Sequence, residues 1–93
     1  MGKLIVVAQV KDPVQWEKTF RTHGEMFKRD YALSKPASYG IGEGNIVTVC
    51  FDVDDVGAAL KSMDSPATAE AMAEDGVMRE TAKFYVLDKE LQF

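Results

Sequence analysis

An α+β fold with the element order βαββαβ is predicted by the apolar segments of this 93-residue sequence. Four segments have the length and composition of β-strands, and two regions with helical periodicity separate them. The first and third strand-like segments are apolar at almost every position, so both of their faces need cover. The two helical regions can cover only one face of a four-stranded antiparallel sheet. We therefore expect helices on one face and a second copy of the chain on the other.

The first strand is expected at residues 4–10, and a helix from Pro13 to about Arg29 follows it. Asp12 can accept hydrogen bonds from the first free N–H groups of this helix, and Pro13 suits the first helical position. Steps of four, three and four place four side chains on one stripe of the helix: Trp16, Phe20, His23 and Phe27. Residues 30–36 are expected to connect this helix to the second strand.

The second and third strands are expected at residues 38–42 and 46–53, joined by a glycine-rich hairpin turn. Asp54 and Asp55 can cap the next helix, whose predicted inner face is Val56, Ala59, Leu60 and Met63. A shorter helix restarts at Ser65-Pro66, turns Ala71 and Met72 inward, and ends at Gly76. Residues 77–80 lead into the last strand, expected at 83–87. We find no linker or repeat, so residues 1–93 are expected to form one domain.

Composition and charge disfavour several classes of function. The chain is 46% hydrophobic and 28% charged, as in an ordinary globular protein. Its net charge of −4 and its scattered basic residues disfavour binding to nucleic acid or to an anionic membrane surface. No apolar stretch approaches the roughly 20 residues that span a bilayer, and the N-terminus lacks the pattern of a secretory signal. Cys50 is the only cysteine. A reduced cytoplasmic protein is therefore expected.

The order βαββαβ with short connections is that of a ferredoxin-like domain. Several short segments of the sequence resemble those of one superfamily with this element order. They are Asp12-Pro13-Val14-Gln15-Trp16, Phe20 with His23, Asn45-Ile46-Val47-Thr48-Val49 after the glycine-rich hairpin, Asp64-Ser65-Pro66, Glu70-Ala71-Met72 and Gly76-Val77. With these features the sequence resembles the dimeric α+β barrel superfamily, which includes the antibiotic-biosynthesis monooxygenases. The resemblance implies a homodimer joined through its sheet faces and a ligand cavity between the helices and the sheet of each subunit.

The resemblance does not assign a reaction, because members of this superfamily oxidise quinols, degrade haem, cyclise polyketides or isomerise lactones. Haem-degrading members hold haem with a histidine of the second helical region, and residues 54–76 contain no histidine. We also match no asparagine–tryptophan pair of the cofactor-free quinol oxidisers, since Asn45 lies in a predicted turn. The glycines at 40–44 lack the following helix of a phosphate-binding loop. No cofactor and no metal are expected.

His23 is the candidate catalytic residue. It is the only histidine, and its phase places it on the aromatic stripe. An imidazole, with an ordinary pKa of about 6.5, could remove a proton from a phenol or from a carbon next to a carbonyl. The alternative is a half-buried packing residue with one hydrogen bond. The groups that could orient the ring are Asp88, Gln9, Thr48 and Tyr39.

A pocket for a small apolar or aromatic ligand could be formed by aromatic and thioether side chains, although residues at such spacing more often serve plain core packing. The candidates are Trp16, Phe20, Phe27, Tyr39, Met72 and Phe84. The Glu74-Asp75 pair is interpreted as a solvated helix end. Two functions are then compatible with the sequence. One is a cofactor-independent monooxygenase, or a cyclase or isomerase, acting on an aromatic or polyketide-like substrate. The other is a non-catalytic ligand-binding or assembly module of the same fold.

Overall fold

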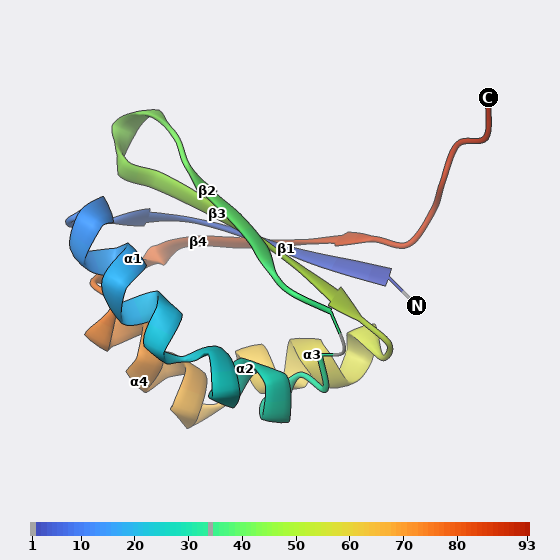
Figure 1. Cartoon of the computed structure of the whole chain (residues 1–93), viewed down its shortest axis with the longest axis horizontal. Helices are drawn as coiled ribbons and strands as arrows, with labels where there is room; N and C mark the ends of the chain where they lie inside the picture. Colours follow the sequence, from blue (N-terminus) through green and yellow to red (C-terminus); the bar gives the residue numbers. More distant parts are fainter. Residues whose placement is uncertain (1, 34) are drawn as a thin grey trace.

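A four-stranded antiparallel sheet with the strand order β2-β3-β1-β4 forms the centre of the computed structural model, which describes residues 2–33 and 35–93. The strands are β1 (Gly2–Val10), β2 (Ser38–Ile41), β3 (Ile46–Val53) and β4 (Val77–Leu87). The α-helices are α1 (Pro13–Thr22), α2 (Gly24–Asp30), α3 (Val56–Met63) and α4 (Pro66–Glu74). Figure 1 shows all four helices on one side of the sheet and none on the other. The predicted ferredoxin-like α+β fold is confirmed.

The face of the sheet towards the helices, the inner face, carries the core. Its side chains on the two central strands are nearly inaccessible to solvent: Leu4, Val6, Ala8 and Val10 from β1, and Val47, Val49, Phe51 and Val53 from β3. Because side chains alternate along a strand, the remaining positions point to the opposite side. The apolar side chains of this outer face are Ile5, Val7, Ile46, Cys50, Met78, Tyr85 and Leu87, and polar ones such as Lys3, Thr48, Asp52 and Lys83 lie among them. Tyr85 and Leu87 are 49% and 52% exposed, and the other five apolar residues are half-buried.

The helix expected over residues 13–29 is divided into two. α1 ends at Thr22, and α2 begins at Gly24. His23 lies between them with φ −92° and ψ 7°, outside the helical range. Glycine is a poor helix former, so Gly24 favours an interruption at this point. The residue that was expected in the middle of one helix therefore occupies a junction between two.

The predicted N-caps are confirmed. Asp12 Oδ1 accepts from the N–H groups of Val14 and Gln15, at 3.0 and 3.3 Å. Asp55 Oδ1 accepts from Ala58 N–H at 3.0 Å, and Ser65 Oγ accepts from Thr68 N–H at 3.3 Å. These side chains satisfy donors that helix starts leave free, so local sequence places three of the four helix starts.

Two predicted details of the second half are wrong. Leu60 was expected on the inner face of α3 but is 38% exposed. β4 begins at Val77, where a connection was expected, and Val77 pairs with Val10 of β1. The register then shifts between Val7 and Gln9, where Gln9 N–H donates to the Thr81 hydroxyl at 2.9 Å. Such a bulge interrupts the alternating pattern by which a strand is detected.

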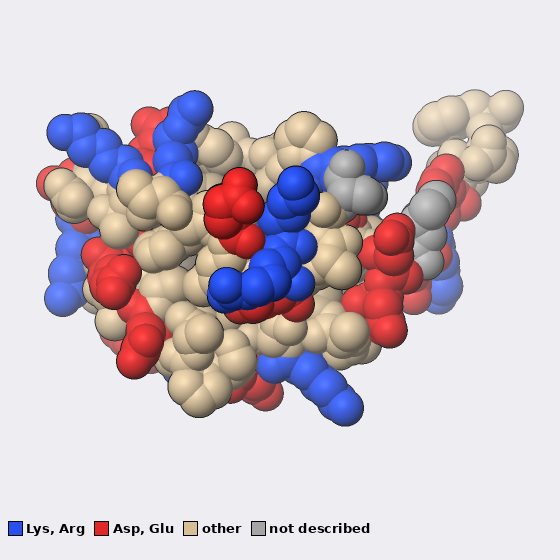
Figure 2. Space-filling model, turned by 60° about the horizontal axis from the view of Figure 1, so that its bottom comes forward, with Lys and Arg blue, Asp and Glu red and all other residues tan. Residues whose placement is uncertain are grey.

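The helical surface carries both signs of charge. Figure 2 shows lysine and arginine side chains intermixed with aspartate and glutamate over this face. The view gives no extended basic patch of the kind that nucleic acids require. Within residues 2–33 and 35–93, no helix combines the length and the apolar character needed to cross a membrane.

Candidate functional site

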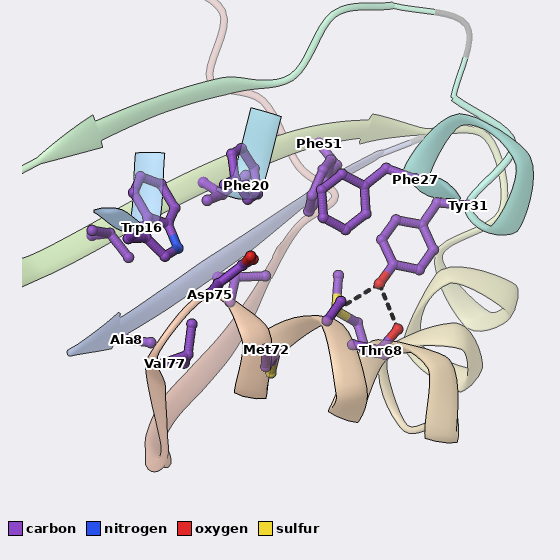
Figure 3. Close-up of a pocket in the computed structure, with 15 residues that line it drawn as sticks. Ala8, Trp16, Phe20, Phe27, Tyr31, Phe51, Thr68, Met72, Asp75 and Val77 are labelled. Atoms are coloured by element: carbon purple, nitrogen blue, oxygen red, sulfur yellow. Dashed lines mark hydrogen bonds between the residues drawn. The ribbon is translucent and has the colours of Figure 1, made fainter. Parts of the chain in front are cut away.

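A cavity of about 50 Å³, the inner cavity, lies between the inner face of the sheet and the helices. Aromatic rings form much of its wall: Trp16 and Phe20 from α1, Phe27 from α2, Tyr31 from the end of α2, and Phe51 from β3 (Figure 3). The other lining residues are Val6, Ala8, Val47, Val49, Met63, Thr68, Ala71, Met72, Asp75 and Val77. The lining is therefore apolar apart from two hydroxyls, the indole N–H of Trp16 and one carboxylate.

The volume of the inner cavity limits what it can hold. A space of this size admits a few water molecules, since one water needs roughly 10–15 Å³ by the same measure. Pockets for small organic ligands usually measure roughly 300–1,000 Å³. An aromatic ligand therefore enters only if side chains of the wall move.

The aromatic wall is continuous from α1 to β3. The rings of Trp16 and Phe20 stack with centroids 4.7 Å apart, and Phe27 follows Phe20 at 5.2 Å. Phe27 in turn lies 5.6 Å from Tyr31 and 5.4 Å from Phe51. Each separation is within the range of favourable ring–ring contact. The helical stripe predicted from the sequence thus forms one side of the inner cavity.

A second hollow, the outer groove, lies on the other side of Phe20 and Phe27 and has a volume of about 430 Å³. The two rings line both hollows, so they form the partition between them. The remaining residues that line the groove are Arg21, Gly24, Lys28, Leu33, Lys35, Pro36, Ala37 and Tyr39. Three of these are basic and none is acidic, and one of the three, Arg21, lies 4.0 Å from the Glu17 carboxylate.

One carboxylate, that of Asp75, lines the inner cavity. Asp75 caps the C-terminus of α4 and is 4% exposed. Figure 3 shows its side chain directed towards the space beside Trp16 and Phe20. Gly76 follows with φ 75°, a conformation that favours glycine, and turns the chain into β4. The interpretation of residues 74–75 as a solvated helix end is therefore wrong for Asp75.

His23 lies behind Asp75 and is not itself a lining residue of the inner cavity. Its Nδ1 is 3.2 Å from Asp75 Oδ1, an ion-pair contact that is not aligned as a hydrogen bond. Its Nε2 is 3.2 Å from Oε2 of Glu74, whose side chain is exposed. The groups that contact the imidazole are thus two carboxylates of α4, and not the four candidates considered from the sequence.

Burial raises the pKa of Asp75 from 3.8 to about 6, because a carboxylate removed from water loses hydration that stabilises its charge. The charge and contact of His23 act in the opposite direction, and the neighbouring Glu74 adds a small increase. Asp75 is therefore mainly ionised at neutral pH and takes up a proton near pH 6.

Tyr31 and Thr68 supply the two hydroxyls of the wall. Tyr31, 4% exposed, places its hydroxyl 2.9 Å from Thr68 Oγ1 and 3.5 Å from Met63 Sδ (Figure 3). Thr68 Oγ1 in turn donates to the Ser62 carbonyl at 2.7 Å. Burial raises the pKa of Tyr31, so its hydroxyl stays protonated. Sequence analysis missed Tyr31, although it continues the helical stripe four residues beyond Phe27.

The predicted ligand-binding residues are divided between the two hollows. Trp16, Phe20, Phe27 and Met72 line the inner cavity. Tyr39 lines the outer groove, where its hydroxyl donates to Glu17 Oε2 at 2.7 Å. Phe84 lines neither hollow, since it lies on the edge strand β4 and is 42% exposed. Among the described residues, no group of three or more His, Cys, Asp or Glu is placed to hold a metal ion.

The sequence matches no protein-family model, and no curated protein matches it significantly. Solved structures resemble it over its whole length. SnoaB, a cofactor-independent oxygenase from Streptomyces nogalater, superposes with a TM-score of 0.71 at 12% identity, covering 98% of this chain and 94% of its own. A candidate antibiotic biosynthesis monooxygenase from Bordetella bronchiseptica gives 0.72 at 14% identity, with 98% and 100% covered. The chain has the antibiotic biosynthesis monooxygenase fold.

Another structure of the same shape is At3g17210 from Arabidopsis thaliana, with a TM-score of 0.71, 12% identity, and 100% of this chain and 99% of its own covered. The resemblance to the antibiotic-biosynthesis monooxygenases is thereby confirmed for the fold. Identities this low do not transfer an activity, because one fold serves many reactions.

Proposed function

We propose that the protein binds a flat aromatic or polyketide-like molecule and acts on it as a cofactor-independent monooxygenase. The observation that carries this proposal is the inner cavity, an aromatic chamber with a single carboxylate in its wall. The shared fold with SnoaB, a cofactor-independent oxygenase, supports it. Cyclase or isomerase chemistry on the same class of substrate would use the same chamber. We place the protein in the cytoplasm, where Cys50 remains a free thiol.

Movement of Phe20 and Phe27 admits the ligand. Both rings are half-buried, and together they separate the inner cavity from the outer groove. Rotation of these rings joins the two hollows into a space of the size that ligand pockets usually have. The junction at His23 and Gly24 lies between them in the chain, and a Cβ at Gly24 would meet no atom within 4 Å. There is therefore room for side chains to move on this side of the partition.

Trp16 reports on ligand binding, because it is the only tryptophan and lines the inner cavity. We expect 4-nitrophenol, a flat ring that quenches indole emission, to quench Trp16 in a saturable manner. Replacement of Phe20 by leucine should weaken this binding by about 2- to 10-fold, since an aromatic contact contributes roughly 0.5–1.5 kcal/mol. Phe84→Leu is the matched control, because Phe84 lies in neither hollow, and should leave the affinity unchanged.

Quenching that rises linearly with 4-nitrophenol would contradict a ligand site. Turnover is tested by oxygen uptake with hydroxylated naphthalenes and anthracenes in buffer free of flavin and metal, compared with the rate without protein. The small volume of the inner cavity favours one alternative, a non-catalytic module whose chamber is filled by its own side chains. That alternative requires both the absence of saturable quenching and the absence of oxygen uptake above the uncatalysed rate.

We also propose that two copies of the chain associate through the outer face. No helix of the described residues covers this face (Figure 1). Its centre is apolar, with Ile5 between Cys50 and Tyr85, and charged side chains such as Lys3, Asp52 and Lys83 lie around this centre. A second sheet packed against it would remove Tyr85 and Leu87 from water and complete a two-sheet barrel. A chain of this length has a small core and buries a limited apolar area on folding. Burial of these side chains between two copies would therefore add to its stability.

Replacement of Ile5 by lysine should convert the dimer into a monomer at micromolar concentration. Ile5 lies in the middle of the outer face between Cys50 and Tyr85, and an unpaired ammonium there would lose its hydration on association. The matched control is Ile41→Lys, since Ile41 is 46% exposed and points to the inner side of the edge strand β2. Sedimentation velocity measures the outcome. A wild-type chain that sediments as a monomer would reject the proposal.

A further inference from the structure

We propose that Asp75 is the catalytic base of the inner cavity and that His23 is its positioning residue. Asp75 would accept a proton from a phenolic O–H or from a C–H next to a carbonyl. The substrate class is thereby narrowed to flat aromatic molecules with such an acidic proton. This inference rests on the proposed function, because it requires that the cavity admit a ligand.

The position of Asp75 carries the inference. Among the described residues that line the inner cavity, Asp75 alone has an ionisable carboxylate, and the cavity contacts it directly. The side chain is 4% exposed, so bulk water does not compete with a ligand for it. Trp16 and Phe20 lie beside it in the wall. A ring that enters between Phe20 and Phe27 would therefore meet the carboxylate next to Phe20.

The contact with His23 leaves the carboxylate available. His23 Nδ1 and Asp75 Oδ1 are both buried, and neither makes an aligned hydrogen bond to any described group. Buried polar atoms are nearly always satisfied, so an unsatisfied pair at a cavity wall calls for an explanation. For the Asp75 carboxylate, which lines the cavity, a ligand hydroxyl that donates to it provides one, whereas His23 Nδ1 keeps only its contact with Asp75 Oδ1. His23, held at 3.2 Å, fixes the carboxylate from behind and does not touch the ligand.

The charged groups around Asp75 come from two elements. His23 approaches from the junction of α1 and α2, and Glu74 precedes Asp75 on α4. The strands β1 and β3 contribute only apolar side chains to the cavity wall, and β4 contributes Val77. The Tyr31 hydroxyl shares the cavity but is bonded to Thr68. The charged side chains that affect the protonation of the Asp75 carboxylate are therefore His23 and Glu74.

The proton transfer is balanced without a further reagent. The O–H or C–H bond of the substrate breaks, and its electron pair remains on the substrate as a phenolate or an enolate. A new O–H bond forms on the Asp75 carboxylate, which becomes a neutral acid. Removal of a proton of this kind is within the capacity of a carboxylate whose proton affinity burial has raised.

The test compares 2-naphthol, which has a phenolic proton, with 2-methoxynaphthalene, which has the same ring and no such proton. Equilibrium dialysis against the full-length protein gives both affinities. We expect Asp75→Asn to weaken 2-naphthol binding by about tenfold or more, since hydrogen bonds to a charged acceptor are among the strong ones. Binding of 2-methoxynaphthalene should be unchanged. In the wild-type protein, the preference for 2-naphthol should disappear as the pH falls through about 6.

Two further variants separate positioning from simple packing. His23→Gln removes a group that lowers the pKa of Asp75, so the midpoint of the pH profile should move upward. Glu74→Gln removes a group that raises this pKa, so the midpoint should move downward. A residue that acted only in packing would change the affinity for both ligands and leave the midpoint in place.

The outcomes distinguish the two proposals. If neither naphthalene binds the wild-type protein, the ligand site fails and the role of Asp75 fails with it. If both bind, and Asp75→Asn affects them equally or not at all, the site stands and the role of Asp75 is rejected. The wild-type pH profile decides the matter independently of any variant, because a preference that does not change between pH 5 and pH 8 also rejects that role.

Discussion

Truncation of Phe51 to alanine should lower the free energy of unfolding by about 3–5 kcal/mol. Phe51 is 2% exposed on the inner face of β3, and its ring lies 5.4 Å from each of the rings of Phe27 and Tyr31. The void that the ring leaves would merge with the existing inner cavity, so the surroundings cannot close around it. Urea titration followed by circular dichroism measures the change.

The matched control for this effect is Phe84→Ala. Phe84 lies on the edge strand β4 and is 42% exposed, so it has much less apolar area to lose. Its truncation should cost clearly less than that of Phe51. Both variants must be compared at one protein concentration, because association through the outer face would contribute to the measured stability. Equal losses would show that the aromatic wall is not the centre of the core.

Local sequence signals were sufficient to predict most of the fold. Residues 46–53 were predicted as a strand and form β3 with the same bounds. Asp12, Asp55 and Ser65 each cap a helix where they were expected to do so. These features depend on neighbours within a few residues in the sequence. Helix caps and strands each favour particular residue types, so the sequence alone indicates where they lie.

Features that depend on distant parts of the chain were not predictable in the same way. β4 extends to Val77 because β1 offers its free edge there, and the bulge opposite Gln9 hides this extension from a search for alternation. The interruption at His23 was missed for a similar reason. The aromatic stripe continues across it, so the hydrophobic periodicity gives no sign of a break.

The site was predictable in its apolar part and not in its polar part. Helical spacing alone brought Trp16, Phe20 and Phe27 to one side, and the structure places all three on the inner cavity. The burial of Asp75 depends on the turn at Gly76 and on the way α4 lies beside the junction at His23. An acidic residue at the end of a helix is usually solvated, so the sequence offered no reason to select Asp75.

Replacement of Asp75 by asparagine should stabilise the protein at neutral and alkaline pH. The pKa of Asp75 is about 6 in the folded protein and 3.8 without perturbation. The folded state therefore binds the proton more tightly, and the ionised carboxylate opposes folding. This cost is absent below the unfolded pKa, develops as the pH rises from about 4 to about 6, and is then constant. A difference of about two pKa units corresponds to at most about 3 kcal/mol.

Chemical unfolding of Asp75→Asn and of wild type at a series of pH values between 4 and 8 measures the effect as a difference. The control is Asp64→Asn, because Asp64 caps the C-terminus of α3 as Asp75 caps that of α4 but is exposed. Both substitutions remove a negative charge from a helix C-terminus, which is slightly favourable in either case. Only the buried position should give a gain in stability that grows between pH 4 and pH 6.

Two results would contradict this prediction. One is the same gain in stability for Asp64→Asn and Asp75→Asn, and the other is a loss of stability at pH 8 for Asp75→Asn. Either would show that ionised Asp75 does not destabilise the folded protein. A base with a raised pKa requires that destabilisation, so the stability profile and the ligand profile of Asp75 must change over the same range of pH.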